Sequence, residues 1–370
     1  MTMNKNSSES RREFVKAIGA GVFTVGAGAL TSNAMAASAN QKKLGIALVG
    51  LGNYATNQLA PALQVTENAY LAGIVTGTPA KEKIWADKYK IDPAHIYNYD
   101  NFDNIINDAA IDVVYVVLPN SMHKEFVIRA ARAGKHVITE KPMGLTAAEC
   151  EEMIAACHKA GVQLSVGYRL QFEDNTQQIV HAGQSLPLGP INYVRSEFSF
   201  IIGNPKQWRL KKELAGGGPI MDIGIYCIQG ARMATGLEPI ALRAVEYKTD
   251  HQKFSSVEET VMWQMEFPGG LYSNSTCSYN MKANELYVSY AKGNARLEPA
   301  YSYRGVGGHL GQLKLPPHQV NQQALQMDDF VVCIRQNKTS KVSGEEGLKD
   351  MKIVDAMYKS MANGGQRVVI

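Results

Sequence analysis

A glycine-containing loop directly after a short apolar strand constrains the fold of this chain more than any other feature. Residues Leu44–Val49 read LGIALV, and residues 50–55 read GLGNYA, the pattern G-x-G-x-x-A. The first glycine permits a tight turn, the second lets the backbone approach a pyrophosphate, and the alanine lets the next helix pack close to the strand. The amino end of that helix attracts phosphates. We therefore expect a dinucleotide-binding unit with these residues at the nucleotide: Gly50, Leu51, Gly52, Asn53 and Tyr54.

The pattern that follows predicts a parallel, doubly wound sheet. Between residues 44 and 166, short apolar runs alternate with helical stretches, as in successive βαβ units. The expected strands are Leu44–Val49, Ala69–Val75, Val113–Leu118, His136–Thr139 and Gln163–Val166. The expected helices are Pro61–Gln64, Lys81–Tyr89, Lys124–Ala133 and Ala147–Ala160. Residues 37–166 are therefore predicted to form a Rossmann domain.

After residue 167 the pattern changes to period-two alternation with hairpin turns, which predicts a large, mostly antiparallel sheet. The expected strands are Ile191–Phe200, Ile240–Tyr247, Glu259–Phe267, Leu271–Tyr279 and Leu286–Ala291. The expected helices are Met221–Thr235, Gln322–Arg335 and Gly344–Met361, and Tyr301–Val320 is expected as a long loop. The fold class is α/β, with a C-terminal α/β domain carrying an open sheet over residues 167–370, whose last helix could pack back on the first domain.

The amino terminus carries a pattern typical of twin-arginine export. Residues 10–16 read SRREFVK, an apolar stretch follows over 17–30, and Ala34-Met35-Ala36 has the small residues of a cleavage site. We expect residues 1–36 to be a signal peptide, the export machinery to be a partner of the precursor, and the mature protein to be periplasmic. A chance arginine pair in a general secretion signal or a membrane anchor stays open.

Composition limits the classes of binding partner that this chain can have. The formal charge is +4, and no basic block suggests nucleic acid. After the signal no apolar run is long enough to span a bilayer, so no membrane partner is expected. The 5 cysteines are odd in number and include no C-x-x-C pair, so we expect small core residues rather than a disulfide framework, and no metal site.

The end of the second expected strand favours NADP over NAD. An NAD enzyme usually presents Asp or Glu there to bind the ribose 2′-hydroxyl. Here the strand runs into Thr76, Gly77 and Thr78, with Lys81 following and no acid between them. Hydroxyls and a lysine would bind a 2′-phosphate that a carboxylate would repel. Alternatively, Lys81 is simply a solvated residue in the first turn of a helix.

Two further strand ends carry candidate residues, since ligands of open α/β sheets bind at the carboxyl ends of the strands. Lys141, between Glu140 and Pro142, could hydrogen-bond a sugar hydroxyl and stabilise an alkoxide. Leu118, Pro119, Asn120 and His123 could hold the nicotinamide ribose. Alternatively, the Glu-Lys-Pro tripeptide is a turn that leads into a helix, and His123 is a solvated histidine at a helix start.

Asp222 and Tyr226 are four residues apart in a predicted helix, hence on one face. Tyr226 could act as a general acid–base on a carbinol if a cation such as Lys141 stabilised its ionised form. Asp222 could bind the neighbouring hydroxyl. Taken alone, such a pair is more often a capping aspartate and a half-buried tyrosine.

Together these stretches make the chain resemble the Gfo/Idh/MocA oxidoreductases, in particular their glucose–fructose oxidoreductase branch. The matching stretches are residues 49–61, 91–105, 114–143, 166–169, 207–226 and 343–351. The resemblance implies that Lys141 and Tyr226 are catalytic, that Asp222 orients the substrate, and that Thr76, Gly77 and Lys81 hold the adenosine phosphate of NADP. It also implies that Arg169, Trp208 and Arg209 line the cofactor.

The resemblance implies an NADP-containing oxidoreductase that oxidises an aldose at C1 and passes the hydride to a second sugar. It implies a homodimer or homotetramer formed through the open sheet. Only residues 37–43 lie between the expected cleavage site and the first strand, where the branch carries a long arm around its cofactor. An NAD-dependent glycosidase, an NADP-dependent aldose dehydrogenase with exchangeable cofactor, and a non-catalytic sugar-binding protein of the same fold remain alternatives.

Overall fold

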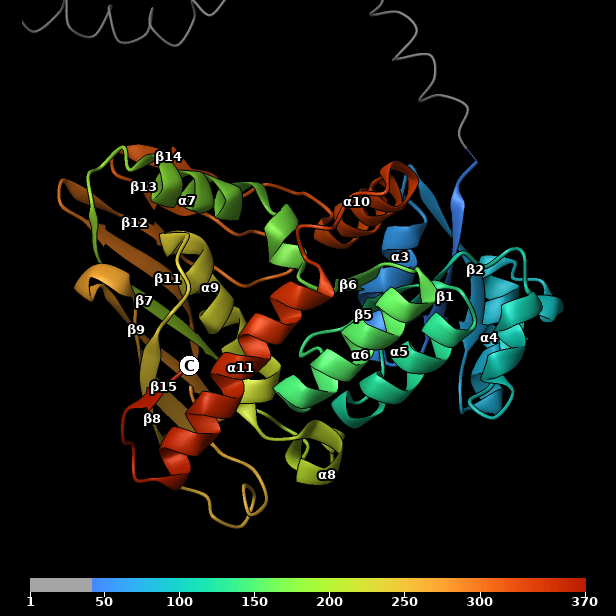
Figure 1. Ribbon diagram of the computed structural model, residues 1–370, viewed down its shortest axis with the longest axis horizontal. Helices are drawn as coiled ribbons and strands as arrows, with labels where there is room; N and C mark the ends of the chain where they lie inside the picture. The colour runs from blue at the N-terminus through green and yellow to red at the C-terminus, as the bar shows by residue number, and fades with distance from the viewer. Residues whose placement is uncertain (1–41) are drawn as a thin grey trace, which may run out of the picture. The chain divides into compact units, whose positions relative to one another are not determined.

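A six-stranded parallel sheet forms the first half of the structure (Figure 1), a computed structural model that describes residues 42–370. The expected signal peptide lies outside the described residues. The strand order is β3-β2-β1-β4-β5-β6, and every pairing between them is parallel. These strands are β1 (Leu44–Val49), β2 (Ala69–Val75), β3 (Ile96–Tyr97), β4 (Val113–Val116), β5 (His136–Thr139) and β6 (Leu164–Val166). The predicted Rossmann topology is confirmed.

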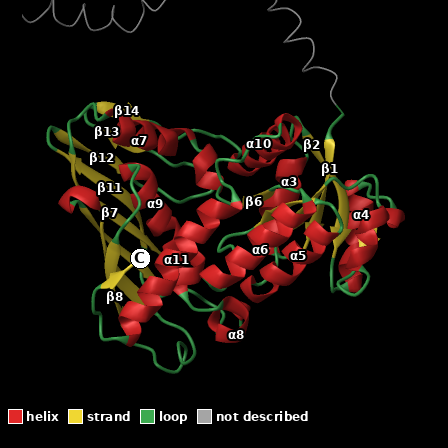
Figure 2. Ribbon diagram, in the orientation of Figure 1, coloured by secondary structure: helices red, strands yellow, loops and turns green. Residues whose placement is uncertain are grey.

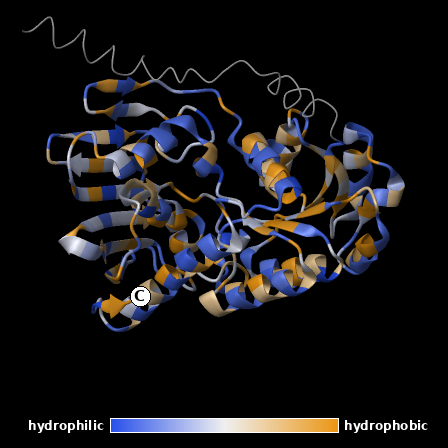
Figure 3. Cartoon of the chain, turned by 45° about the horizontal axis from the view of Figure 1, so that its top comes forward, coloured by the Kyte–Doolittle hydropathy of each residue, from blue (hydrophilic) through white to orange (hydrophobic). Residues whose placement is uncertain are grey.

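Helices connect these strands and cover both faces of the sheet. The helical segments are η1 (Ala55–Leu59, π-helical), α3 (Ala60–Leu63), α4 (Pro79–Tyr89), η2 (Pro93–His95), η3 (Phe102–Asn107), η4 (Asn120–Met122), α5 (His123–Arg132) and α6 (Ala147–Ala160). Local chemistry sets their limits: Thr146 caps α6 by accepting from the Glu149 amide at 3.2 Å, and Gly161 ends it at φ 68°. In β1 all residues after Leu44 are buried, and Figure 3 shows the hydrophobic strands between these helices.

A nine-stranded sheet forms the second half, as Figure 2 shows in yellow. Its order is β14-β13-β12-β11-β7-β10-β9-β8-β15, antiparallel except for the β7–β10 pair. The strands are β7 (Ile191–Ser199), β8 (Ala241–Tyr247), β9 (Thr260–Glu266), β10 (Tyr272–Ser278), β11 (Ala283–Tyr290), β12 (Gly293–Leu297), β13 (Gly308–Leu310), β14 (Leu313–Leu315) and β15 (Val368–Val369). The large, mostly antiparallel sheet is as predicted.

The prediction of a long loop over Tyr301–Val320 is wrong in part, because β13 and β14 lie within this segment. Each has three residues, too few for an alternating pattern to stand out in the sequence. Hydrogen bonding to neighbouring strands defines them instead. β13 pairs with β12, and after a turn with Gly311 at φ 56° β14 pairs with β13.

The second half also contains helical segments. They are η5 (Arg169–Phe172), α7 (Asp174–Ser185), η6 (Trp208–Leu210), α8 (Lys212–Ala215), η7 (Ile220–Gly224, π-helical), α9 (Ile225–Thr235), η8 (Pro268–Gly270), α10 (Gln322–Gln336) and α11 (Gly344–Ala362). Helix α10 buries Met327, Phe330 and Val331 in the same core cluster as Ile46 and Leu48 of β1. Helix α11 packs between α6 and β8.

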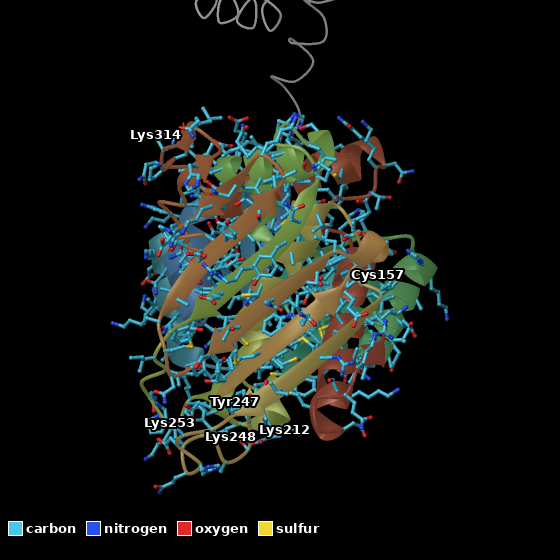
Figure 4. All side chains as sticks on the ribbon, turned by 90° about the vertical axis from the view of Figure 1, so that its left-hand side faces the viewer. Cys157, Lys212, Tyr247, Lys248, Lys253 and Lys314 are labelled. Carbon is cyan, nitrogen blue, oxygen red and sulfur yellow. The ribbon has the colours of Figure 1, made fainter. Side chains whose placement is uncertain are left out.

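Side chains rather than helices cover the outer face of the nine-stranded sheet, as Figure 4 shows. The exposed large side chains of β8, β9 and β10 are Tyr247 (56%), Met262 (46%) and Tyr272 (47%). Four of the cysteines are buried, as expected of core residues, and Cys333 is partly buried. Among residues 42–370, no helix combines the length and apolarity that crossing a bilayer requires.

Candidate active site

A cavity of about 990 Å³ lies where the first sheet ends and the second begins. Its floor comes from the carboxyl ends of the parallel strands, and its opposite wall comes from β7, α9 and the segment before β13. Of the residues predicted for the site, all but Gly77 line it: Gly50, Leu51, Gly52, Asn53, Tyr54, Thr76, Lys81, Leu118, Pro119, Asn120, His123, Glu140, Lys141, Arg169, Trp208, Arg209, Asp222 and Tyr226.

The glycine loop, Gly50–Gly52, has the geometry that a pyrophosphate site needs. Gly50 adopts φ +96°, and a Cβ there would lie 2.5 Å from the Val117 carbonyl oxygen. A Cβ on Gly52 would meet nothing within 4 Å, so this backbone faces open space beside the start of the next helix. Exposed amides at a helix start bind phosphates, so these residues fit a dinucleotide.

The residues after β2 fit a 2′-phosphate. Lys81 reaches back to the glycine loop, where its Nζ donates to the Leu51 carbonyl at 2.7 Å, and the Thr76 hydroxyl accepts from the Thr78 amide at 3.1 Å. Glu140 and Asp222 are the carboxylates among the described cavity-lining residues, and neither follows β2. This end of the cavity therefore presents hydroxyls and an ammonium group without an acid.

Gly77 contributes by its lack of a side chain. A Cβ there would lie 2.6 Å from the Tyr99 ring, and it is Tyr99 that lines the cavity at this point. Tyr99 packs edge-on against Phe126, with ring centroids 5.4 Å apart. Sequence reasoning did not identify Tyr99, because Gly77 follows β2 and Tyr99 follows β3, and their contact is seen only once the chain is folded.

Asp222 is the electrostatic centre of the site. Lys141 Nζ donates to its backbone carbonyl at 2.6 Å and lies 3.3 Å from Oδ1, while Arg209 Nε lies 3.0 Å from Oδ2. The Tyr279 hydroxyl donates to Oδ2 at 3.0 Å. Burial alone raises the pKa of Asp222, but the Arg209 and Lys141 cations outweigh it and hold this pKa below its usual range. Asp222 is therefore an ionised acceptor held by two cations, not a helix cap.

Two cations lie close to the ring of Tyr226. Lys141 Nζ is 4.8 Å and Arg169 Cζ is 5.0 Å from the centroid of its ring. The ring is 8% exposed and packs edge-on against Phe198, with centroids 5.5 Å apart. Tyr226 therefore lies close to both cations in the cavity that Lys141 and Asp222 also line.

Two buried polar groups position Lys141. Glu140 accepts from the Tyr115 hydroxyl at 2.8 Å, and a Cβ on Gly167 would lie 2.6 Å from its Oε1. Burial raises the pKa of Glu140, although Lys141 opposes this. The ring nitrogens of His123 face the carbonyl oxygens of Pro142 (2.9 Å) and Leu118 (3.0 Å). The turn that carries Lys141 is therefore held from both sides.

Three models of one family match successive parts of the chain. Residues 44–168 match its oxidoreductase domain with an NAD-binding Rossmann fold, residues 174–296 its GFO/IDH/MocA C-terminal domain, and residues 311–370 its C-terminal alpha/beta domain. The chain belongs to the Gfo/Idh/MocA oxidoreductase family. The predicted family is confirmed, and with it the prediction of an oxidoreductase.

Relatives in this family include enzymes named for sugars and for NADP. The crystal structure of an aldose-aldose oxidoreductase from Caulobacter crescentus, complexed with glycerol, is 42% identical with a TM-score of 0.85, covering 89% of this chain and 100% of its own. The NADP(+) D-xylose 1-dehydrogenase of Haloarcula marismortui is 26% identical over 87% of this chain and 92% of its own length. A scyllo-inositol dehydrogenase from Lactobacillus casei shares the fold, with a TM-score of 0.74 at 21% identity, covering 89% of this chain and 98% of its own.

Within this family fold, the structure corrects one alternative. The sequence left two positions open for His123, at the nicotinamide ribose or in solvent. The prediction of a solvated histidine is wrong, because the side chain is fully buried between two strand ends. Burial lowers its pKa, although backbone carbonyls favour the protonated form. Asn120 is also buried and donates to the Ala215 carbonyl at 2.9 Å, joining the loop after β4 to α8.

The sequence motifs of the Gfo/Idh/MocA family did not identify the cavity-lining residues that the second domain contributes. The lining residues that the sequence left out are Tyr99, Val117, Phe198, Phe200, Gln207, Ile223, Asn284, Tyr301, Ser302 and Tyr303. The alternation of Phe198 with Phe200 was a usable signal, because residues two apart in an extended chain share a face. In the part of the chain that the structure describes, no cluster of three or more His, Cys, Asp or Glu could hold a metal ion.

Proposed function

We propose that this chain is a periplasmic, NADP-containing sugar oxidoreductase. It oxidises an aldose such as glucose at C1 to the lactone and passes the hydride to a second sugar, fructose or another aldose. One observation carries the proposal: Lys141, Asp222 and Tyr226 converge in the cavity that begins at the glycine loop. The names of the aldose-aldose oxidoreductase and the NADP(+) D-xylose dehydrogenase support both the substrate class and the cofactor.

The cavity divides between cofactor and sugar. The glycine loop would hold the pyrophosphate, and Thr76, Thr78 and Lys81 the 2′-phosphate, since these groups lie in open space or carry phosphate-binding donors. When bound, NADP supplies the hydride acceptor and, after reduction, the hydride donor. The space beside Asp222 and Tyr226 is left for the sugar.

The residues of this chain handle the proton. As the C1 hydroxyl of the aldose becomes the lactone carbonyl, its proton passes to the Tyr226 phenolate oxygen. Lys141 stabilises the alkoxide and the phenolate, because its ammonium group lies 4.8 Å from the Tyr226 ring centroid. Asp222, kept ionised by Arg209 and Lys141, accepts a hydrogen bond from a neighbouring sugar hydroxyl. In the second half-reaction Tyr226 returns its proton to the carbonyl oxygen of the second sugar.

Export explains why hydride would pass between two sugars. The twin-arginine pattern at residues 10–16 would carry the folded, loaded protein to the periplasm. An exported enzyme without a supply of free NADP must regenerate the nucleotide in place, and a second sugar does this.

The outer face of the nine-stranded sheet supports a homodimer or homotetramer. It exposes Tyr247, Met262 and Tyr272, which are 46–56% accessible. Tyr247 and Met262 are diagonal neighbours on paired strands, and exposed apolar patches are typical of protein interfaces. Sedimentation of the purified protein measures the subunit number, and a monomer at micromolar concentration would refute this part.

A second candidate is an ordinary NADP-dependent aldose dehydrogenase that exchanges its cofactor, as the name of the Haloarcula relative suggests. The two differ in one experiment. Purified protein, without added nucleotide, is incubated with glucose and fructose, and the products are separated. We expect gluconolactone and sorbitol in equal amounts over many turnovers. Turnover that requires added NADP would instead favour the exchangeable dehydrogenase.

A further inference from the structure

Tyr303 joins the two halves of the cavity. Its ring centroid lies 5.7 Å from that of Tyr54, with the planes inclined by 31°, and 4.4 Å from the Arg169 guanidinium carbon. Tyr54 lies two residues after the glycine loop, and Arg169 also lies over the ring of Tyr226. A row of contacts, Tyr54–Tyr303–Arg169–Tyr226, therefore runs along the cavity from the phosphate end to the catalytic tyrosine.

The second-domain half of this row is rigidly held. Arg169 is 2% exposed and donates to the carbonyl oxygens of Tyr301 at 2.6 Å and Ser302 at 2.9 Å. These two residues directly precede Tyr303, so Arg169 fixes the backbone from which the Tyr303 side chain projects. Gln322, at the start of α10, accepts from Arg169 and donates to the Ser302 carbonyl at 3.3 Å.

The first-domain half is anchored by the neighbouring residue of the same helix. Gln323 Nε2 lies 3.4 Å from the Tyr54 hydroxyl, and Gln323 is 4% exposed. Helix α10 also packs against α3 and η1, the helical segments that follow the glycine loop (Figure 1). The start of α10 therefore sets the positions of both tyrosines that meet across the cavity.

Tyr303 itself is not a core residue. It is 43% exposed, unlike Arg169, Tyr226 and Tyr301 around it. Its contacts with Tyr54 and Arg169 therefore add little to the folded core, yet they close the row along the cavity. A dinucleotide with its phosphates at the glycine loop and its reactive ring at Tyr226 would extend between the same two ends.

We propose that Tyr54, Tyr303 and Arg169 form an aromatic clasp, closed by Tyr303, that slows the release of NADP from this chain. This role rests on the proposed function, because hydride exchange between two sugars needs a nucleotide that stays bound. Opening the clasp breaks one aromatic pair and one cation–π contact, which together slow release by about tenfold to a hundredfold.

Nucleotide release tests the clasp without any sugar chemistry. The full-length mature protein is loaded with NADPH, mixed with a large excess of NADP, and the loss of bound-NADPH fluorescence is followed. Tyr303→Ala should release the nucleotide at least about tenfold faster than wild type. Tyr303→Phe keeps the ring and should release it at nearly the wild-type rate. Ile106→Ala removes a comparably exposed large side chain from η3, outside the cavity and outside the nine-stranded sheet, and is the matched control.

The pairing of the two rings gives a second, independent measurement. If Tyr54 and Tyr303 act through one contact, Tyr54→Leu with Tyr303→Ala should release NADPH little faster than either single variant, rather than by the product of the two effects. Tyr54→Leu alone also tests the contact if Tyr303→Ala does not fold. Release from Tyr303→Ala at the rate of wild type and Ile106→Ala would overturn the clasp. Faster release from Tyr303→Ala in a protein that exchanges no hydride between sugars would overturn the proposed function and leave the clasp standing.

Discussion

Replacing Tyr226 with Phe isolates the proton-transfer step from everything else that this residue does. The ring is buried against Phe198, and its centroid lies 4.8 Å from Lys141 Nζ and 5.0 Å from Arg169 Cζ. Phenylalanine keeps that packing and loses only the oxygen that would carry the proton. Melting temperature and nucleotide content should therefore stay near those of the wild type.

The rate of hydride transfer should fall sharply. A positioned acid–base group contributes about 10²–10⁴-fold, or about 3–5 kcal/mol of the barrier. Stopped-flow absorbance of nicotinamide reduction, after mixing loaded protein with glucose, measures this step directly. Tyr290→Phe, which removes the hydroxyl of another buried tyrosine away from the cavity, is the control and should react at the wild-type rate. Reduction of the Tyr226→Phe protein at that same rate would remove Tyr226 from the mechanism.

Three further predictions follow from other parts of the chain. Thr76→Asp places a carboxylate at the expected 2′-phosphate position and should shift nucleotide preference toward NAD, measured by binding titration; unchanged NADP preference would contradict the assignment. Arg11→Lys combined with Arg12→Lys, outside the described residues, should retain active protein in the cytoplasm, measured by cell fractionation; full export of the double variant would refute the signal. Glu259→Gln should make the melting temperature fall less between pH 4.5 and pH 2. Burial raises the pKa of Glu259, but hydrogen-bond donors of Asp250, Asn280 and Thr249 lower this pKa to about 2. The ionised carboxylate therefore stabilises the fold above pH 4.5, and this stabilisation is lost as the pH falls to 2. Equal pH slopes for the variant and wild type would show that these hydrogen bonds do not set acid stability.

Local patterns were sufficient for the Rossmann half and for Lys141, Asp222 and Tyr226. The apolar runs and the glycine loop predicted five of the six strands, and β3 was missed because its two residues form no pattern. Lys141 was predicted from its place at a strand end, and Asp222 and Tyr226 from their helical spacing. Each of these signals lies within a short stretch of the chain, so it can be recognised in the sequence without knowing the tertiary structure.

The rest of the site depends on contacts between distant segments. The Tyr279 hydroxyl reaches Asp222 from 57 residues away, and Gln323 reaches Tyr54 across 269 residues. Tyr303 was hidden in a segment expected to be a loop, where aromatic residues carry no directional signal until the sheet register is known. Local propensity cannot predict such pairings, since tertiary packing of α10 and the second sheet decides them.

The central claim is that the chain carries its own NADP and reduces it with an aldose. The most direct measurement is the absorbance spectrum of the purified protein, recorded without added nucleotide before and after glucose is supplied. The account predicts that the band of reduced nicotinamide appears on adding glucose and disappears on adding fructose or a second aldose. A spectrum that shows no such band until NADP is added would contradict the claim.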